Sequence, residues 1–201
     1  MSIQVAILVF DNVEALDFAG PYEVFTTASR VHARSHPHDA PLFATQCVAR
    51  SADTVCARAG LRIIPDASFA SCSHTDLLLI PGGVVDAAMA CKPTMNWIAA
   101  TAGTASTVAS VCTGAFLLAQ SGVIQNGPVT THWEDVADLQ RLFPALDVQS
   151  GPRWVDQGRT ITSAGISAGI DMCLHLVGKL ASHDLAVRTA RQMDYAWQPQ
   201  P

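Results

Sequence analysis

The stretch TVASVCTGAFLLAQSG (residues 107–122) joins a run of small and β-branched residues to an apolar helical pattern, with one cysteine at the junction. The pattern predicts a strand over 107–111 and a helix that ends at Gly122, connected by a sharp turn at Cys112. A side chain at such a turn projects beyond the edge of a sheet, and the helix that follows favours a thiolate by lowering the pKa of the thiol. A buried structural cysteine and a nucleophilic cysteine both fit this position.

Strand-like and helix-like segments alternate along the chain, which is typical of an α/β sandwich with a mostly parallel sheet. The expected strands cover residues 3–10, 42–50, 61–69, 75–83 with its terminal glycine turn, and 107–111, followed by a hairpin over 153–165. The expected helices cover residues 17–30, 93–103, 115–122, the end of 129–144, 169–181 and 183–197. In open sheets of this kind, ligands bind beyond the carboxyl ends of the strands.

The size and charge of the chain limit its function. Its 201 residues predict one domain over 1–201, and its formal net charge of −5 comes with scattered arginines, so it has no basic stripe for nucleic acid. The apolar runs are too short to cross a membrane, and the N-terminus is typical of a first strand rather than a signal peptide. We therefore expect a soluble cytoplasmic protein that binds neither nucleic acid nor membranes.

The other cysteines and the histidines give no clear metal site. Six cysteines are present without a C-x-x-C pair, and their irregular spacing predicts reduced thiols. Besides the junction cysteine, the expected positions are the core for Cys47, Cys56 and Cys173, and loops or helix ends for Cys72 and Cys91. His32, His36 and His38 lie in a polar segment with proline, which favours a solvated loop over a metal site. We expect no metal and no cofactor.

A nucleophilic thiol needs a neighbour that can handle its proton. Asp17 follows the first expected strand and His132 follows the short run VTT, so both are candidates. Each has a structural alternative: Asp17 suits the cap of a helix, and His132 suits a packed position. Gly82 and Gly83 are placed either to bring an amide to an oxyanion hole or simply to make a turn. These residues all follow strands, at the edge where Cys112 is expected.

Four segments, IPGG (80–83), SVCTGAFLLAQSG (110–122), TTHW (130–133) and ITSAGISAGID (161–171), together resemble the ThiJ/PfpI family of the class I glutamine amidotransferase-like superfamily. The resemblance covers essentially the whole chain. It implies a flavodoxin-like three-layer α/β sandwich with a mostly parallel sheet and a cysteine nucleophile elbow. The segment LDFAGP (16–21) narrows it to two branches, the isonitrile hydratases and the N-terminal domains of AraC-type regulators.

The family resemblance assigns catalytic roles to particular residues. Cys112 matches the reactive cysteine, and Asp17 matches the acidic residue that faces it. Thr113 matches a residue whose amide and hydroxyl lie close to both, and Gly83 with Gly82 matches the turn on the oxyanion side.

A second set of residues matches the substrate pocket or its surroundings: His132, Trp133, Ala164, Gly165 and Ile166. Here the segment SAG (163–165) departs from the glycine-richer sequence of the hydratases, which puts the pocket shape and the substrate in doubt.

The resemblance implies an enzyme that hydrates an isonitrile to an N-substituted formamide through a thioimidate. Since the aspartate must be protonated for part of that cycle, we expect burial to raise its pKa. The alternatives are a non-catalytic ligand-sensing domain, and a glyoxalase, deglycase or peptidase. The regulators carry a DNA-binding region after this domain, and the chain stops at Pro201, so direct DNA binding is not expected. A homodimer is expected, with Tyr195 and Trp197 suited to its interface.

Overall fold

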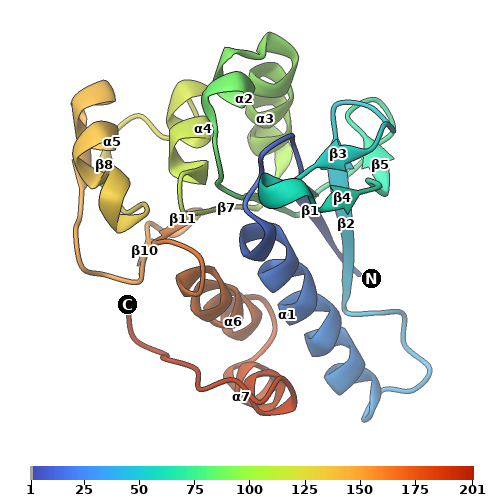
Figure 1. Ribbon diagram of the computed structural model, residues 1–201. Helices are drawn as coiled ribbons and strands as arrows, with labels where there is room; N and C mark the ends of the chain where they lie inside the picture. The colour runs from blue at the N-terminus through green and yellow to red at the C-terminus, as the bar shows by residue number, and fades with distance from the viewer. Residues whose placement is uncertain (1) are drawn as a thin grey trace.

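A seven-stranded sheet forms the centre of the structure, a computed structural model that describes residues 2–201 (Figure 1). In sheet order its strands are β10 (Trp154–Asp156), β11 (Thr160–Ser163), β7 (Thr107–Val111), β6 (Leu77–Ile80), β1 (Ile3–Leu8), β2 (Phe43–Ala49) and β5 (Ala67–Ser68). The hairpin β10–β11 pairs antiparallel, as its sequence predicts, and the other neighbours pair parallel.

The order of the parallel strands confirms the flavodoxin-like fold. Numbered along the chain, β1, β2, β6, β7 and β11 lie in the order 2-1-3-4-5 across the sheet, which is the flavodoxin-like arrangement. The chain passes from β1 to β2 on one side and then returns to β6 on the other side of β1. This switch point, beyond the carboxyl ends of β1 and β6, is where such sheets bind ligands.

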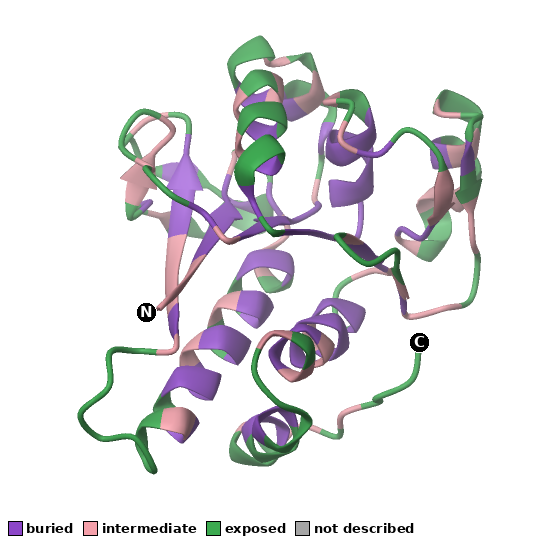
Figure 2. Ribbon diagram, turned by 180° about the vertical axis from the view of Figure 1, so that it is seen from behind, coloured by how far each residue is buried: buried purple, intermediate pink, exposed green. Residues whose placement is uncertain are grey.

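Helices cover both faces of the sheet and complete three layers. One layer contains α1 (Ala15–Ala33), α6 (Ala168–Leu180) and α7 (His183–Gln192), and the other contains α2 (Asp86–Ala90), α3 (Lys92–Thr104), α4 (Gly114–Gln120) and α5 (Val136–Leu142) (Figure 1). Alternate residues of β1 point to opposite faces of the sheet. Val5 and Ile7 pack in the core on the side of α1, and Ala6 and Leu8 pack in the core on the side of α4. The central strands are therefore buried on both sides (Figure 2). Within residues 2–201, no helix joins the length and the hydropathy that a membrane crossing requires.

Short strands account for two differences from the sequence-based expectations. The expected strand over 61–69 is two strands: β4 (Arg62–Ile63) pairs with β3 (Val55–Cys56), and β5 joins the main sheet. Pro65 lies between them and has no N–H for a ladder. The short strand before His132, β8 (Gly127–Val129), pairs with β9 (Leu146–Val148) in a separate sheet.

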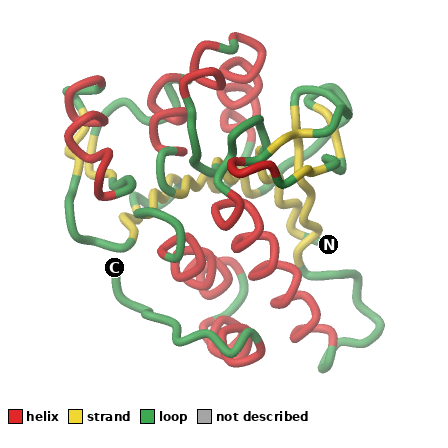
Figure 3. The backbone as a smooth tube through the Cα atoms, viewed as in Figure 1, coloured by secondary structure: helices red, strands yellow, loops and turns green. Residues whose placement is uncertain are grey.

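The last helix is shorter than expected. It ends at Gln192, and Asp194 has a φ of 51°, a left-handed conformation that commonly terminates helices. The loop that follows packs on its own chain (Figure 3). Trp197 Nε1 donates to the Asp171 carbonyl at 3.3 Å, and the Tyr195 hydroxyl donates to the Ser167 carbonyl at 3.4 Å. These two aromatics anchor the tail, and because both remain partly exposed, their expected role at a partner interface stays a prediction.

Candidate active site

Cys112 lies on the turn between β7 and α4, with a φ of 56°. A residue other than glycine in this left-handed region raises the free energy of the folded state by about 1–3 kcal/mol. Contacts with neighbouring residues must therefore hold the Cys112 backbone in this conformation. Its amide donates to the Ser163 carbonyl at 3.2 Å, and the Thr131 hydroxyl donates to its carbonyl at 2.9 Å. The side chain is almost completely buried. The sharp strand-to-helix turn expected from the sequence is thus present.

Glycine at position 114 lets this turn pass close to the neighbouring strand. A Cβ atom there would overlap the carbonyl oxygen of Ile80 at the end of β6. Helix α4 therefore begins against the backbone of β6, and this contact brings the Cys112 turn beside the glycines that follow that strand.

Asp17 lies in the first turn of α1 and is completely buried. The Gly82 amide donates to its Oδ2 at 3.1 Å, whereas its Oδ1 finds no hydrogen-bond partner among residues 2–201. Burial is the main cause that raises the pKa of Asp17 to about 6, against the lowering effect of the Gly82 bond. The alternative of a helix cap does not apply, because Glu14 occupies that position and accepts from the Ala15 amide.

The Asp17 carboxyl and the Cys112 thiol lie close enough to change each other's proton affinity. Burial, and then the charge of Asp17, raise the pKa of the Cys112 thiol to about 12. This direction is opposite to the one expected from the helix N-terminus. The amide of Thr113 does favour the thiolate, but desolvation outweighs it. Near pH 7 the pair therefore holds its proton on sulfur, with the carboxylate beside it.

The two glycines after β6 hold the acid and the elbow together. Gly82 donates to Asp17, and Gly83 donates to the Thr113 hydroxyl at 2.9 Å. That hydroxyl donates in turn to the Gly83 carbonyl at 2.9 Å, so one side chain makes two bonds to one residue. Gly83 has a φ of 137°, and a Cβ there would overlap the Asn12 carbonyl oxygen. Both amides expected to form an oxyanion hole are thus already engaged, and the Thr113 hydroxyl binds the glycine turn.

His132 lies near this pair and has an acidic partner, Asp135, that is not among the residues expected at the site. Its Nδ1 lies 3.4 Å from Asp135 Oδ2 and accepts the Glu134 amide at 3.4 Å. Its charge acts on Asp17 and favours the carboxylate. A Cβ at Gly165 would overlap the His132 ring, so that glycine lets the ring pack against the loop after β11. The i, i+3 spacing of histidine and aspartate was the available signal for the pair.

The remaining predicted pocket residues differ in their surroundings. The Ala164 carbonyl accepts the Cys112 amide at 3.3 Å, which ties this loop to the elbow. Trp133 is 74% exposed, and Ile166 is 40% exposed with a φ of 54°. Exposed apolar side chains next to a site residue along the chain are Leu16, Val84, Trp133 and Ile166.

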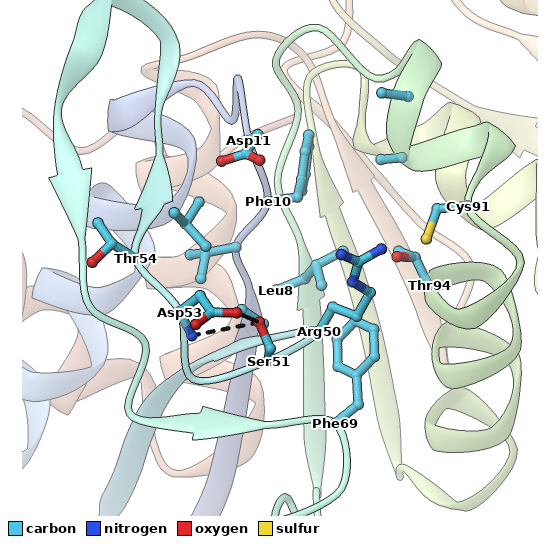
Figure 4. A pocket seen from close by; sticks show the side chains of 15 residues that line it. Leu8, Phe10, Asp11, Arg50, Ser51, Asp53, Thr54, Phe69, Cys91 and Thr94 are labelled. Carbon is cyan, nitrogen blue, oxygen red and sulfur yellow. Dashed lines mark hydrogen bonds between the residues drawn. The ribbon is translucent and has the colours of Figure 1, made fainter.

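A separate pocket of about 380 Å³ lies beyond the carboxyl ends of β1 and β2 (Figure 4). Cys112 is not among its lining residues, and neither is any residue predicted for the substrate pocket. Arg50, Cys91 and Thr94 gather on one side of it (Figure 4). A hydrogen bond with Thr94, and to a smaller extent Arg50, lowers the pKa of the Cys91 thiol. Cys91 lies at a helix end, as expected, but its pattern in the sequence does not predict this environment.

Comparisons with known proteins identify the family of the chain and support its fold. Residues 3–179 match the model of the DJ-1/PfpI family. The chain is 32% identical to the isonitrile hydratase of Pseudomonas putida, over 99% of this chain and 81% of that protein. It is 26% identical to the HTH-type transcriptional regulator GbdR of Pseudomonas aeruginosa, over 95% of this chain but only 50% of the regulator. A crystal structure of a ThiJ/PfpI family protein from Pseudomonas syringae superposes with a TM-score of 0.84 at 28% identity, covering 99% of this chain and 77% of that one.

Proposed function

The chain belongs to the DJ-1/PfpI family, and from that premise we propose that it is a cysteine-dependent hydratase that converts an isonitrile into an N-substituted formamide. One observation carries the proposal: the buried carboxyl of Asp17 lies beside the Cys112 thiol on the elbow, with one oxygen unpaired among the described residues. The name of the Pseudomonas putida relative supports the same chemistry.

The first step adds the thiol to the isonitrile R–N≡C at its terminal carbon. The Asp17 carboxylate takes the thiol proton as sulfur attacks and delivers it to that carbon. A carbon–sulfur bond and a carbon–hydrogen bond form, and the product is the thioimidate R–N=CH–S–Cys112. A pKa of about 6 suits this transfer, because the acid is ionised near pH 7 yet holds a proton more readily than an exposed carboxyl.

The second step hydrolyses the thioimidate. Asp17 again acts as the base: water bonds to the carbon through oxygen, and one hydrogen passes to nitrogen. The tetrahedral intermediate R–NH–CH(OH)–S–Cys112 then breaks its carbon–sulfur bond. It releases R–NH–CHO, and the remaining proton returns to sulfur. No cofactor enters this balance, and the substrate is a small molecule.

Incubation with phenyl isonitrile, followed by chromatographic detection of N-phenylformamide, tests the proposal. We expect turnover by the wild-type chain and none by Cys112→Ala. Cys56→Ala, which removes an exposed cysteine, is the matched control and keeps full activity. Absence of turnover, or turnover that persists in Cys112→Ala, rejects the hydratase. Methylglyoxal assayed in parallel distinguishes a glyoxalase or deglycase.

A ligand-sensing domain is the second candidate, favoured by the similarity to GbdR. The chain spans half the length of that regulator, so its similarity covers one part of the regulator only. A sensor would be stabilised by a small ligand without consuming it. A rise in melting temperature with unchanged ligand, in a chain that does not hydrate isonitriles, supports this alternative.

The homodimer also stays a prediction. Sedimentation velocity of the full chain at several concentrations tests it. A single species at the monomer mass of 21.3 kDa contradicts it.

A further inference from the structure

A cluster of possible metal ligands lies at the C-terminal end of α1, at the opposite end of that helix from Asp17. His32 belongs to the last turn of the helix, His36 follows one turn later, and Asp39 lies in the loop that leads to β2. One ligand atom from each of the three residues lies within 4.8 Å of the other two. The sequence favoured a solvated loop here. Residues 34–40 are indeed exposed, and the structure in addition brings two of the three histidines of this segment close to a carboxylate.

The two imidazole rings lie face to face, and because a nitrogen lone pair lies in its ring plane, one ring must turn before both bind the same ion. They stack with centroids 4.0 Å apart and an angle of 5° between their planes. Ions of the zinc type hold nitrogen and oxygen ligands at about 2.0–2.1 Å, so the ligand atoms of a tetrahedral site lie about 3.4 Å apart. Because His36 and Asp39 are exposed, changes of side-chain rotamer can bring the ligand atoms to that spacing without moving the core.

Backbone contacts orient His36 as a ligand. Its Nδ1 lies 3.2 Å from the His32 carbonyl oxygen, which only accepts hydrogen bonds. The Ser35 hydroxyl, which can donate or accept, also lies 3.1 Å from this Nδ1. With its hydrogen on Nδ1, the ring offers the lone pair of Nε2 to a metal ion. Metal-binding histidines commonly have this arrangement, with the second nitrogen donating to a carbonyl. The Asp39 amide donates to the His36 carbonyl at 3.2 Å and keeps the carboxylate beside the rings.

The electrostatic surroundings favour a cation. A helix of 19 residues ends here, and the C-terminal end of a helix carries partial negative charge. Asp39 adds a full negative charge when ionised. Arg34, the cation nearest along the chain, donates instead to Gln192 of α7 at 2.6 Å.

We propose that His32, His36 and Asp39 form a surface site for a divalent transition-metal ion of the zinc, nickel and copper type. Two imidazoles and one carboxylate suit these ions better than calcium or magnesium, which prefer oxygen ligands. The remaining coordination positions are open to water. A bound ion joins the end of α1 to the loop before β2, which is a function separate from the chemistry at Cys112.

Copper(II) added to the full chain at one equivalent provides the test. The electron paramagnetic resonance spectrum should show coupling to imidazole nitrogens, and His36→Ala should lose that coupling. Calorimetry with nickel(II) should show affinity at least tenfold weaker in both His36→Ala and Asp39→Asn. His38→Ala removes a histidine of the same loop that lies outside the cluster, so it should bind like wild type.

The exposed Cys56 is a competing source of metal binding, and the variants distinguish it from the proposed site. Metal that binds equally well to wild type, His36→Ala and Asp39→Asn belongs to another site and overturns the proposal. Equal weakening in His38→Ala also overturns it, because a diffuse histidine-rich surface then explains the binding. Since both target side chains are exposed, thermal melting without metal should be unchanged in all three variants.

Discussion

The amide of Gly82 donates a 3.1 Å hydrogen bond to Oδ2 of Asp17, a residue 65 positions earlier in the chain and completely buried. This bond fixes the carboxyl at the switch point of the sheet, beside the elbow. It favours the charged form of Asp17, but burial favours the neutral form more strongly. The candidate active site is therefore built at a cost in stability.

Asp17→Asn should stabilise the folded chain at neutral pH. The pKa of Asp17 rises from 3.8 to about 6 on folding, so the native state binds the proton more tightly. The stability contributed by the protonated Asp17 carboxyl is fully present below about pH 4 and is lost as the pH rises through 6. At pH 8 the variant should gain up to about 3 kcal/mol in free energy of unfolding, and near pH 3.5 almost nothing. Urea denaturation at both pH values measures the difference.

The control for that comparison is Asp194→Asn, an exposed position whose left-handed backbone asparagine tolerates. It should change stability little at either pH. If Asp17→Asn is less stable than wild type at pH 8, then burial of the Asp17 carboxylate does not lower the stability of the chain as predicted.

The rate of the proposed hydration should increase with pH through about 6. Asp17 must be ionised to take the proton from Cys112, and its pKa is about 6. We expect kcat/KM with phenyl isonitrile to rise toward a plateau above pH 7 in wild type. Asp17→Asn should lose about 100-fold or more and show no such rise, since general-base catalysis contributes that much. If kcat/KM instead falls between pH 5 and 7, the protonated form of Asp17 acts in the rate-limiting step, which contradicts its proposed role as a base.

Gly114→Ala should prevent stable folding or cost several kcal/mol, because its Cβ overlaps the Ile80 carbonyl oxygen. Gly103→Ala is the matched control. It lies near the end of α3 with no atom within 4 Å of the added Cβ, so it should gain up to about 1 kcal/mol through helix propensity. Expression level and chemical denaturation report both effects. Equal stability of the two variants would mean that α4 can move away from β6.

The sequence predicted the central strands and the convergence of the site because both follow from local patterns. In a chain where strand-like and helix-like segments alternate, an apolar run such as LLLI (77–80) predicts a strand covered on both faces. Parallel strands then bring their carboxyl ends to the same edge of the sheet. The strand pattern therefore predicts Asp17 and Cys112 at the same edge of the sheet. The hairpin around Gly158 also followed from local turn chemistry.

The rest depended on tertiary contacts. Both Glu14 and Asp17 can cap a helix, and only packing against Gly82 decides that Asp17 is the buried one. The direction of the Cys112 pKa shift depends on desolvation, which a motif does not encode. Cys56, expected in the core, is exposed because β3 and β4 form a small sheet outside the main one.

Cys91 should be alkylated before the buried thiols of Cys47 and Cys112. Thr94 and Arg50 lower its pKa, whereas burial raises the pKa of Cys112 to about 12 and that of Cys47 to about 12. Since the thiolate is the reactive form, iodoacetamide at pH 7 should modify Cys91 before either buried cysteine. Timed labelling with peptide mass spectrometry measures the order.

Arg50→Met should slow the labelling of Cys91, and Arg62→Met, at another exposed arginine, should not. Modification of Cys112 ahead of Cys91 would show that its thiol is ionised and accessible in the native chain, contrary to the burial of the site.

Arg153→Ala should destabilise the chain by about 3–5 kcal/mol, because it leaves Asp171 buried without its cation. Arg153 Nε donates to Asp171 Oδ2 at 2.7 Å, and Asp171 is completely inaccessible to solvent. The same carboxyl accepts the Gln198 amide at 3.1 Å, so the C-terminal tail should loosen as well. Arg141→Ala is the control, because its pair with Asp138 is exposed and such pairs contribute at most about 1 kcal/mol. Equilibrium unfolding in urea compares the variants, and limited proteolysis detects the freed tail; equal losses in both variants would refute a special role for the buried pair.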